Sequence, residues 1–199
     1  MANYRTSRIL PTILTIIVIV IAIAGLVALA RLIFTGSATG SADINLTQQH
    51  LLDTNDGQAV SMTVRGPIVA DEDFRSYQIV ISPSQRKFTA FTGYLDVVTN
   101  QQSLSNNTAA YSQFVNALNK ANFAVGAPFE GDRNNVLGIC ATGMVYEFRT
   151  LTDGQENEML WTSTCSGSKG SLRASVKQLS QLFLNQVPDG SDIIKQIRL

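Results

Sequence analysis

The chain is poor in the residues on which many catalytic and nucleic-acid-binding proteins depend. Its 199 residues contain one histidine and two cysteines, and 15 Lys and Arg residues balance 15 Asp and Glu residues. Nucleic-acid binding normally needs a strong basic field, so the zero net charge argues against it. A thiol nucleophile needs a base, and the single histidine, His50, is far from both cysteines in the sequence. Because the first cysteine is Cys140, we expect no lipid-modified cysteine at the N-terminus.

A long apolar run near the N-terminus predicts a transmembrane helix. Between Ile9 and Phe34 the only charged residue is Arg31. About twenty apolar residues, at roughly 1.5 Å each, match the ~30 Å hydrocarbon core of a bilayer, and we expect residues 9–33 to span it. The alternative is a cleavable signal peptide, which the A-x-A pattern at residues 28–30 supports. The run is longer than the roughly 7–15 apolar residues of a signal peptide, so we expect it to be retained.

Basic residues on either side of this segment predict its orientation. Arg5 and Arg8 precede it, whereas Arg31 alone lies at its far end. Basic residues accumulate on the cytoplasmic side of a membrane. We therefore expect a cytoplasmic N-terminus over residues 1–8 and a chain that continues outside the cell membrane after the span.

The remaining sequence predicts one α+β domain. The small, polar segment TGSATGSA indicates a flexible tether over residues 34–42, and the domain covers residues 43–199. Its pattern reads helix, three strands, helix, two strands, helix, which favours an antiparallel sheet of four or five strands packed by two main helices. The expected strands are residues 58–66, 75–82, 86–94, 142–151 and 156–164, and residues 95–98 are expected to extend the sheet. The expected helices are 41–57, 108–122, one that begins near Leu172, and a final turn in 191–199.

Cys140 and Cys165 are expected to form a disulfide bond. The segment TDG, around Asp153, predicts a hairpin turn, and the two cysteines lie almost symmetrically about it. Residues equidistant from a hairpin turn face each other across the two strands or their immediate continuation. An even number of cysteines suits a domain in an oxidising compartment. The bond would close the open end of the hairpin and stabilise the domain by roughly 3 kcal/mol.

The segment SGSKGS after Cys165 suggests phosphate chemistry, but the spacing argues against it. Arg173 lies too far along the chain for a phosphatase cradle, and Lys169 precedes the last glycine, whereas a Walker loop needs it after that glycine. We expect Ser168 or Ser171 to cap the final helix. The alternative is that this helix start binds an anion.

Two further groups of side chains have a structural and a functional interpretation. The adjacent acids of residues 71–73 form either an exposed turn or a calcium site, and neighbouring side chains usually point apart, which favours the turn. Tyr146, Phe148 and Trp161 either pack in the core or form an exposed strip for a glycan or a partner. Strands need one buried face, so we expect core packing.

Three segments carry a resemblance to a known group of proteins. With the N-terminal anchor, MTVRGPIVADEDFRSYQIVIS, CATGMVYEF and LWTSTCSGSKGSL resemble uncharacterised single-pass membrane-anchored envelope proteins of small-genome, candidate-phyla bacteria. The resemblance covers most of the region after the tether. It implies a bacterial source and an envelope location, and it implies no activity and no functional residues.

The sequence is therefore interpreted as a membrane-anchored extracytoplasmic module for binding or assembly. We identify no catalytic, cofactor-binding or metal-binding residues, and we expect no cofactor. The expected partners are the lipid bilayer, through residues 9–33, and an unidentified envelope protein. One alternative is a pilin-like structural subunit, although the apolar run lacks the acid of pilins. Another is an envelope hydrolase, which would need a nucleophile or an acid pair that the sequence does not reveal.

Overall fold

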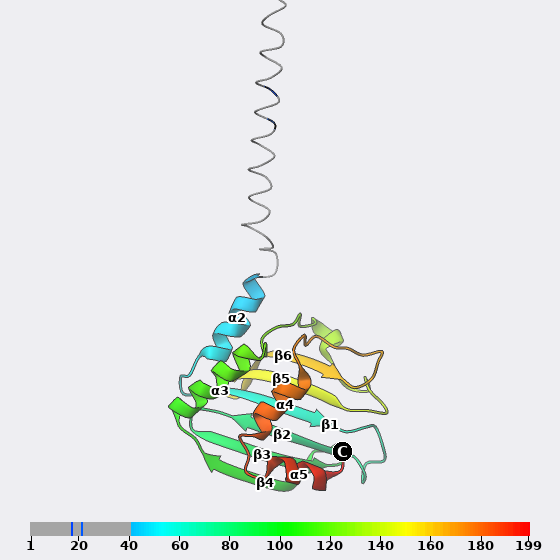
Figure 1. Cartoon of the computed structure of the whole chain (residues 1–199). Coiled ribbons are helices and arrows are strands. Elements are labelled where there is room, and N and C mark those ends of the chain that lie inside the picture. Colours follow the sequence, from blue (N-terminus) through cyan, green and yellow to red (C-terminus); the bar gives the residue numbers. More distant parts are fainter. Residues whose placement is uncertain (1–16, 18–20, 22–40) are drawn as a thin grey trace, which may run out of the picture. The chain divides into compact units, whose positions relative to one another are not determined.

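The computed structural model describes residues 17, 21 and 41–199. Residues Asp43–Leu199 form one compact unit, in which helices lie across one face of a six-stranded antiparallel sheet (Figure 1). The predicted α+β class is confirmed. The predicted transmembrane segment, residues 9–33, lies outside the described residues apart from Ile17 and Ile21. None of the helices that are described is long and apolar enough to cross a membrane.

The sheet is a four-stranded meander with a hairpin added to its first strand. Its order is β4-β3-β2-β1-β5-β6, and all neighbouring strands are antiparallel. The bounds are β1 Gln58–Arg65, β2 Arg75–Ile81, β3 Gln85–Thr92, β4 Val97–Ser105, β5 Val145–Thr152 and β6 Gln155–Ser163. Asp153 and Gly154 have φ values of 52° and 79°, so the β5–β6 turn has the left-handed conformation that tight hairpins favour. β4 and β6 are the edges of the sheet.

Two of the four described α-helices begin at capping side chains. The bounds of the four are α2 Ser41–Leu52, α3 Thr108–Lys120, α4 Val176–Leu184 and α5 Gly190–Ile197. Asn107 Oδ1 accepts a hydrogen bond from Ala110 N (2.9 Å) at the start of α3, and Ser175 Oγ accepts one from Gln178 N (3.4 Å) at the start of α4. α2 begins at Ser41, so it includes the last two residues of the expected tether; residues 34–40 lie outside the described part.

The core lies between the helices and one face of the sheet. A row of buried apolar side chains crosses that face, each paired with the next in the ladder: Phe88, Ile79, Met62, Phe148 and Leu160. The helices cover it with Tyr111, Phe114, Val115 and Leu118 from α3 and with Leu179 and Phe183 from α4. The period of two along the strands and of 3.6 along the helices places these residues on facing surfaces.

The sheet is larger than the sequence predicts. It has six strands rather than four or five, because residues 97–105 form a full edge strand, β4, where the pattern predicts only an extension over residues 95–98. Most side chains of β4 are exposed, so no apolar alternation marks this strand in the sequence. More than two helices also pack on the core, since residues of α5 contact it beside α3 and α4.

The prediction that Ser168 or Ser171 caps the final helix is wrong. α4 begins at Val176, and Ser175 is its cap. The preceding residues run along β6 instead: Ser171 N and Leu172 N both donate to Trp161 O, at 2.9 and 3.0 Å. Residues 168–171 do not start a helix, so the helix start on which the suggested anion site depends is absent from this segment.

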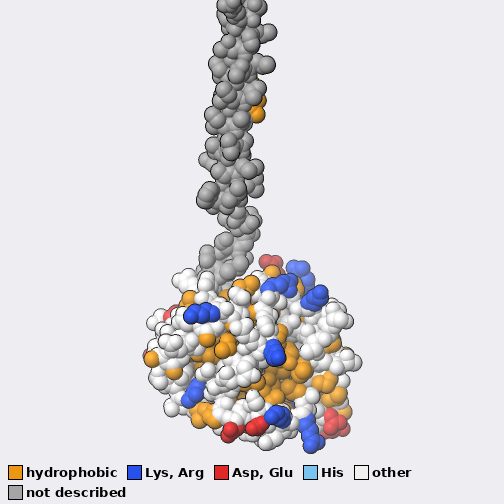
Figure 2. All heavy atoms as spheres, in the orientation of Figure 1, with side chains coloured by type: hydrophobic (Ala, Val, Ile, Leu, Met, Phe, Trp, Pro, Cys, Tyr) orange, Lys and Arg blue, Asp and Glu red, His pale blue; other side chains and the backbone are white. Residues whose placement is uncertain are grey.

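Charged side chains are dispersed over the face shown in Figure 2. Lys, Arg, Asp and Glu side chains lie in several separate places there, with apolar side chains visible between them. This distribution agrees with the zero net charge of the chain.

Candidate functional site

A cleft of about 350 Å³ opens where β1 ends and β5 begins. Its walls come from the β1–β2 loop, the β3–β4 turn and the connection between α3 and β5, three segments that are distant in the sequence. The residues that line it are mainly apolar: Arg65, Gly66, Ile68, Phe74, Tyr94, Val136, Leu137, Gly138, Ile139, Cys140 and Val145. An apolar concavity with few polar groups is the usual form of a binding site.

Tyr94 joins two of these walls. Its hydroxyl group donates to Val69 O (2.7 Å) and accepts from Val69 N (3.1 Å). Its ring stacks on Phe74, with 4.2 Å between the ring centroids. The β3–β4 turn and the β1–β2 loop are thereby held together, with the tyrosine ring at the cleft.

The acidic turn, residues 71–73, holds the backbone of Tyr94 through a hydrogen bond. Asp71 Oδ1 accepts a hydrogen bond from Tyr94 N (2.7 Å). Gly93 has a φ of 71°, and a Cβ atom there would lie 3.0 Å from the same carboxylate oxygen. The predicted turn at residues 71–73 therefore has a structural role through Asp71. Across residues 17, 21 and 41–199, no group of three or more His, Cys, Asp or Glu side chains could hold a metal ion.

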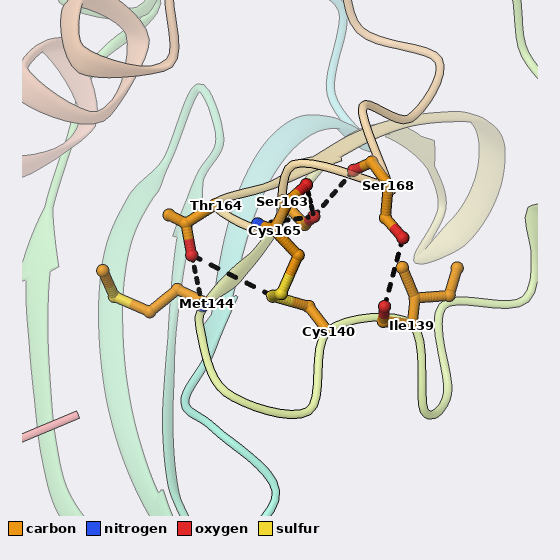
Figure 3. Close-up of a disulfide and its surroundings, with 7 residues drawn as sticks. All are labelled: Ile139, Cys140, Met144, Ser163, Thr164, Cys165 and Ser168. Carbon is orange, nitrogen blue, oxygen red and sulfur yellow. Dashed lines mark hydrogen bonds between the residues drawn. A yellow bond between two sulfur atoms is a disulfide. The ribbon is translucent and has the colours of Figure 1, made fainter.

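The disulfide bond anchors the third wall. Cys140 and Cys165 are joined as predicted, with a Cα–Cα distance of 5.6 Å (Figure 3). The two residues are not opposite each other in the ladder, which ends where Met144 O accepts from Thr164 N (3.0 Å) and Thr164 Oγ1 accepts from Met144 N (2.9 Å). A turn over residues 141–143 brings Cys140 back toward Cys165.

Two hydrogen bonds add to this anchor. Ser168 Oγ donates to Ile139 O (3.2 Å; Figure 3), and Ile68 N donates to Ala141 O (2.9 Å). The second bond connects the disulfide-bonded loop directly to the β1–β2 loop. Ser168 therefore positions the wall of the cleft.

Arg65 is the one charged residue that lines the cleft within the described chain, and its charge is matched. Its Nε atom lies 2.8 Å from Glu147 Oε1, and its Nη1 atom lies 3.9 Å from Asp96 Oδ1. Arg149 contacts the other oxygen of Glu147, whose side chain is fully buried, and pairs with Glu156 (Nε–Oε2 2.6 Å). Arg65 therefore pairs with two carboxylates, and the cleft carries no unpaired positive charge from it.

Large apolar side chains remain exposed around the cleft. The exposed fractions are 47% for Ile68, 47% for Tyr94 and 75% for Leu137. Val69, next to Ile68, is 41% exposed. Single exposed apolar residues are common, but a group of them around a concave apolar site indicates a surface for interaction.

The aromatic residues of the β5–β6 hairpin pack inside the domain, away from this cleft. Phe148 lies in the core, and Trp161 is buried on the opposite face of the sheet against Phe129, with 5.9 Å between the ring centroids. Tyr146 is half-buried, and burial raises the pKa of its hydroxyl group. The interpretation as core packing is confirmed for Phe148 and Trp161.

Sequence reasoning missed the cleft apart from Cys140. A signal was present: the apolar pairs Ile68-Val69 and Val136-Leu137 lie inside polar loops, where apolar residues have no strand or helix to bury them. The other sequence candidates lie elsewhere. His50 is exposed on α2, and Cys165 is oxidised in the disulfide bond.

A scan against protein-family models, a search of curated proteins and a search of solved structures each found no match.

Proposed function

We propose that residues 43–199 are a protein-binding domain on the outer side of a bacterial cell membrane, anchored through residues 9–33, and that the cleft receives an uncharged apolar side chain of an envelope protein partner. The observation that carries this function is the exposure of Ile68, Tyr94 and Leu137 around an apolar concavity. Leaving these side chains in water costs about 25 cal/mol per Å² of apolar surface, which a partner that covers them recovers.

The charges around the cleft support an apolar occupant. Arg65 is the only ionisable group lining the described cleft besides the Tyr94 phenol, and Glu147 already pairs with it at 2.8 Å. An acidic ligand would have to compete with this buried carboxylate, which would be left without one of its two cations. A neutral apolar group meets no such competition.

The residues of the cleft support binding rather than catalysis at this position. Those described as lining it include no acid, histidine, serine or free thiol. The hydrolase alternative would need such a group near the bound substrate. The pilin-like alternative depends on residues 9–33, which lie outside the described chain except for Ile17 and Ile21.

Site-specific photo-cross-linking tests the binding function. A benzophenone amino acid in place of Leu137 in the full-length chain, illuminated in intact cells, should form a discrete adduct with one envelope protein. The control is the same substitution at Leu95, which is 89% exposed and does not line the cleft. Ile68→Asp should lower the Leu137 adduct at least about tenfold, equivalent to 1.4 kcal/mol. The same adducts from both positions, or no effect of Ile68→Asp, would contradict the proposal.

The membrane location has separate tests. Protease added to intact spheroplasts should remove residues 43–199, and protection until lysis would reverse the proposed orientation. The intact mass of the protein from the membrane fraction should include residues 9–33. A mature chain that begins at Arg31 would instead show that a signal peptide had been cleaved.

A further inference from the structure

The two edge strands of the sheet, β6 and β4, differ in what lies beside them. At the β6 edge, the residues after the strand fold back: Ser171 N and Leu172 N bind Trp161 O, and Trp161 N donates to Ser171 Oγ (3.0 Å). At the other edge, β4 pairs with β3 on one side, and no other strand of the described chain lies beside it. The fold covers part of one edge and leaves the other open.

β4 lacks the features that usually prevent an edge strand from pairing with another chain. Its sequence, VVTNQQSLS, contains no charged residue and no proline, whereas natural edge strands often carry lysine or proline. A bulge at Thr99 interrupts the ladder, and residues 100–105 pair regularly with β3. This regular part is an uncharged template for the addition of a strand.

The backbone of β4 shows which groups are open. Asn106 N donates to Ser84 O, on the β3 side, at 2.9 Å. Residues of an antiparallel strand alternate in the direction of their backbone bonds. Gln102 therefore directs its N–H and C=O groups to β3, as Asn106 does, whereas Gln101 and Ser103 direct theirs away from the sheet.

We propose that the β4 strands of two copies of this chain pair antiparallel about a twofold axis at Gln102, so that one sheet continues through both copies. In this register Gln101 of each copy exchanges two backbone hydrogen bonds with Ser103 of the other. Each Gln102 lies opposite its own counterpart, as a twofold interface requires.

The side chains of β4 suit its own copy. The register places Asn100 opposite Leu104 and Thr99 opposite Ser105, so no like charges face each other. The Oε1 atom of Gln102 is buried and has no hydrogen-bond partner within the described part of the chain. Residues of its own chain enclose this atom, so the pairing rests on the open backbone groups and on the uncharged side chains of the strand. A charged peptide would place a charge opposite these neutral side chains.

The size of the contact determines the kind of experiment. A single pair of strands buries less than the ~1,200–2,000 Å² of a standard stable interface. We therefore expect a weak dimer that forms at high local concentration, as between chains held in one membrane. Covalent trapping detects such a contact better than chromatography does.

Cysteine cross-linking of the full-length chain tests the register, because both native cysteines are in the disulfide bond. Gln102→Cys places two thiols at a pair whose Cα atoms are about 4.5 Å apart, within the range that a disulfide bond accepts. Gln155→Cys, at an exposed glutamine on the β6 edge, is the matched control. With a mild oxidant in the isolated cell fraction that contains the protein, Gln102→Cys should give at least tenfold more dimer than Gln155→Cys. The control accounts for association through other parts of the chain.

Ser103→Pro supplies the second part of the test. The backbone N–H group of Ser103 points away from β3. Proline at this position therefore removes a donor that an added strand needs, and it leaves the hydrogen bonds between β4 and β3 in place. Gln102→Cys/Ser103→Pro should lose the dimer at an unchanged unfolding temperature. If proline lowers that temperature, Gln101→Lys/Ser103→Lys replaces it, because the register sets these lysines opposite each other. Equal dimer from Gln102→Cys and Gln155→Cys, or full cross-linking in the blocked variant that remains folded, would overturn the proposal.

Discussion

Removal of the disulfide bond should weaken the fold by an amount that follows from the length of the loop it closes. Cys140 and Cys165 are separated by 25 residues. The chain-entropy relation then gives about 12 cal/mol/K, or about 3.5 kcal/mol at 25 °C. Each kcal/mol lowers the melting temperature of a domain of this size by roughly 2–4 °C. Cys140→Ala/Cys165→Ala should therefore lower it by roughly 7–14 °C.

The variant should nevertheless remain folded at 25 °C. Cys140 is buried, but neither cysteine belongs to the apolar cluster between the helices and the sheet. The hydrogen bonds from Ile68 N to Ala141 O and from Ser168 Oγ to Ile139 O still hold the loop. The circular dichroism spectrum should thus be unchanged, whereas photo-cross-linking from Leu137 should fall because the wall of the cleft is less constrained.

Urea unfolding of the full-length protein, followed by circular dichroism, measures the loss. The slope of the free energy against urea should rise in the variant, since an uncross-linked unfolded chain exposes more surface. Dithiothreitol should reproduce the loss in the native sequence and leave the variant unaffected. A loss below about 1 kcal/mol would refute the entropic reasoning, and an equal response of both proteins to the reductant would show that the bond is not the cause.

Three further substitutions test the structure. Glu147→Gln leaves Arg65 and Arg149 without a shared carboxylate and should lower the free energy of urea unfolding by about 2–3 kcal/mol. The loss is smaller than for a fully buried pair because the Arg65 side chain is 30% exposed. The control is Asp192→Asn, in the exposed pair with Lys195, which should cause no measurable change. Gly93→Ala should lower the free energy of unfolding by roughly 1–2 kcal/mol, because Gly93 has a φ of 71°. It should also lower the yield of the Leu137 adduct by displacing Tyr94, and an unchanged yield would show that Tyr94 is not part of the binding site. Burial raises the pKa of Tyr77 and Tyr111, so the stability they contribute is present below the unfolded value of about 10 and is lost as the pH rises above it. Urea titrations at about pH 8 and about pH 11 should show this loss. Tyr111→Phe should reduce this pH-dependent loss of stability, because it removes one of the two buried hydroxyl groups that titrate. That hydroxyl group has no hydrogen-bond partner among the described residues, so its removal breaks no hydrogen bond there.

Local sequence patterns were sufficient to predict the helices and strands that bury one face. The apolar spacing of Tyr111, Phe114, Val115 and Leu118 predicts α3 with its start at Thr108, and the turn at Asp153 predicts the β5–β6 hairpin. In both cases residues close in the sequence determine the structure, through helix periodicity and turn conformation. The pairing of the two cysteines also followed, since no third cysteine competes.

Elements that depend on distant contacts were not predictable in this way. β4 is exposed, so its side chains carry no apolar alternation, and it is a strand because β3 offers it an edge. α4 begins only at Val176, with Ser175 as its cap, because Ser171 N and Leu172 N bind Trp161 O instead of beginning a helix. Tertiary hydrogen bonds outweighed a plausible local cap in that segment.

The amino-acid sequence alone determined the α+β class, most strand and helix positions, the partner of each cysteine and the prediction of an apolar anchor. Only the tertiary structure decided where a binding site lies. The apolar pairs that contain Ile68 and Leu137 are visible in the sequence. Only the antiparallel sheet, which brings the ends of β1, β3 and β5 together, shows that they line one cleft with Tyr94. Three loops that are distant in the sequence form this cleft, and the spacing of residues within any one of them does not predict contact with the other two.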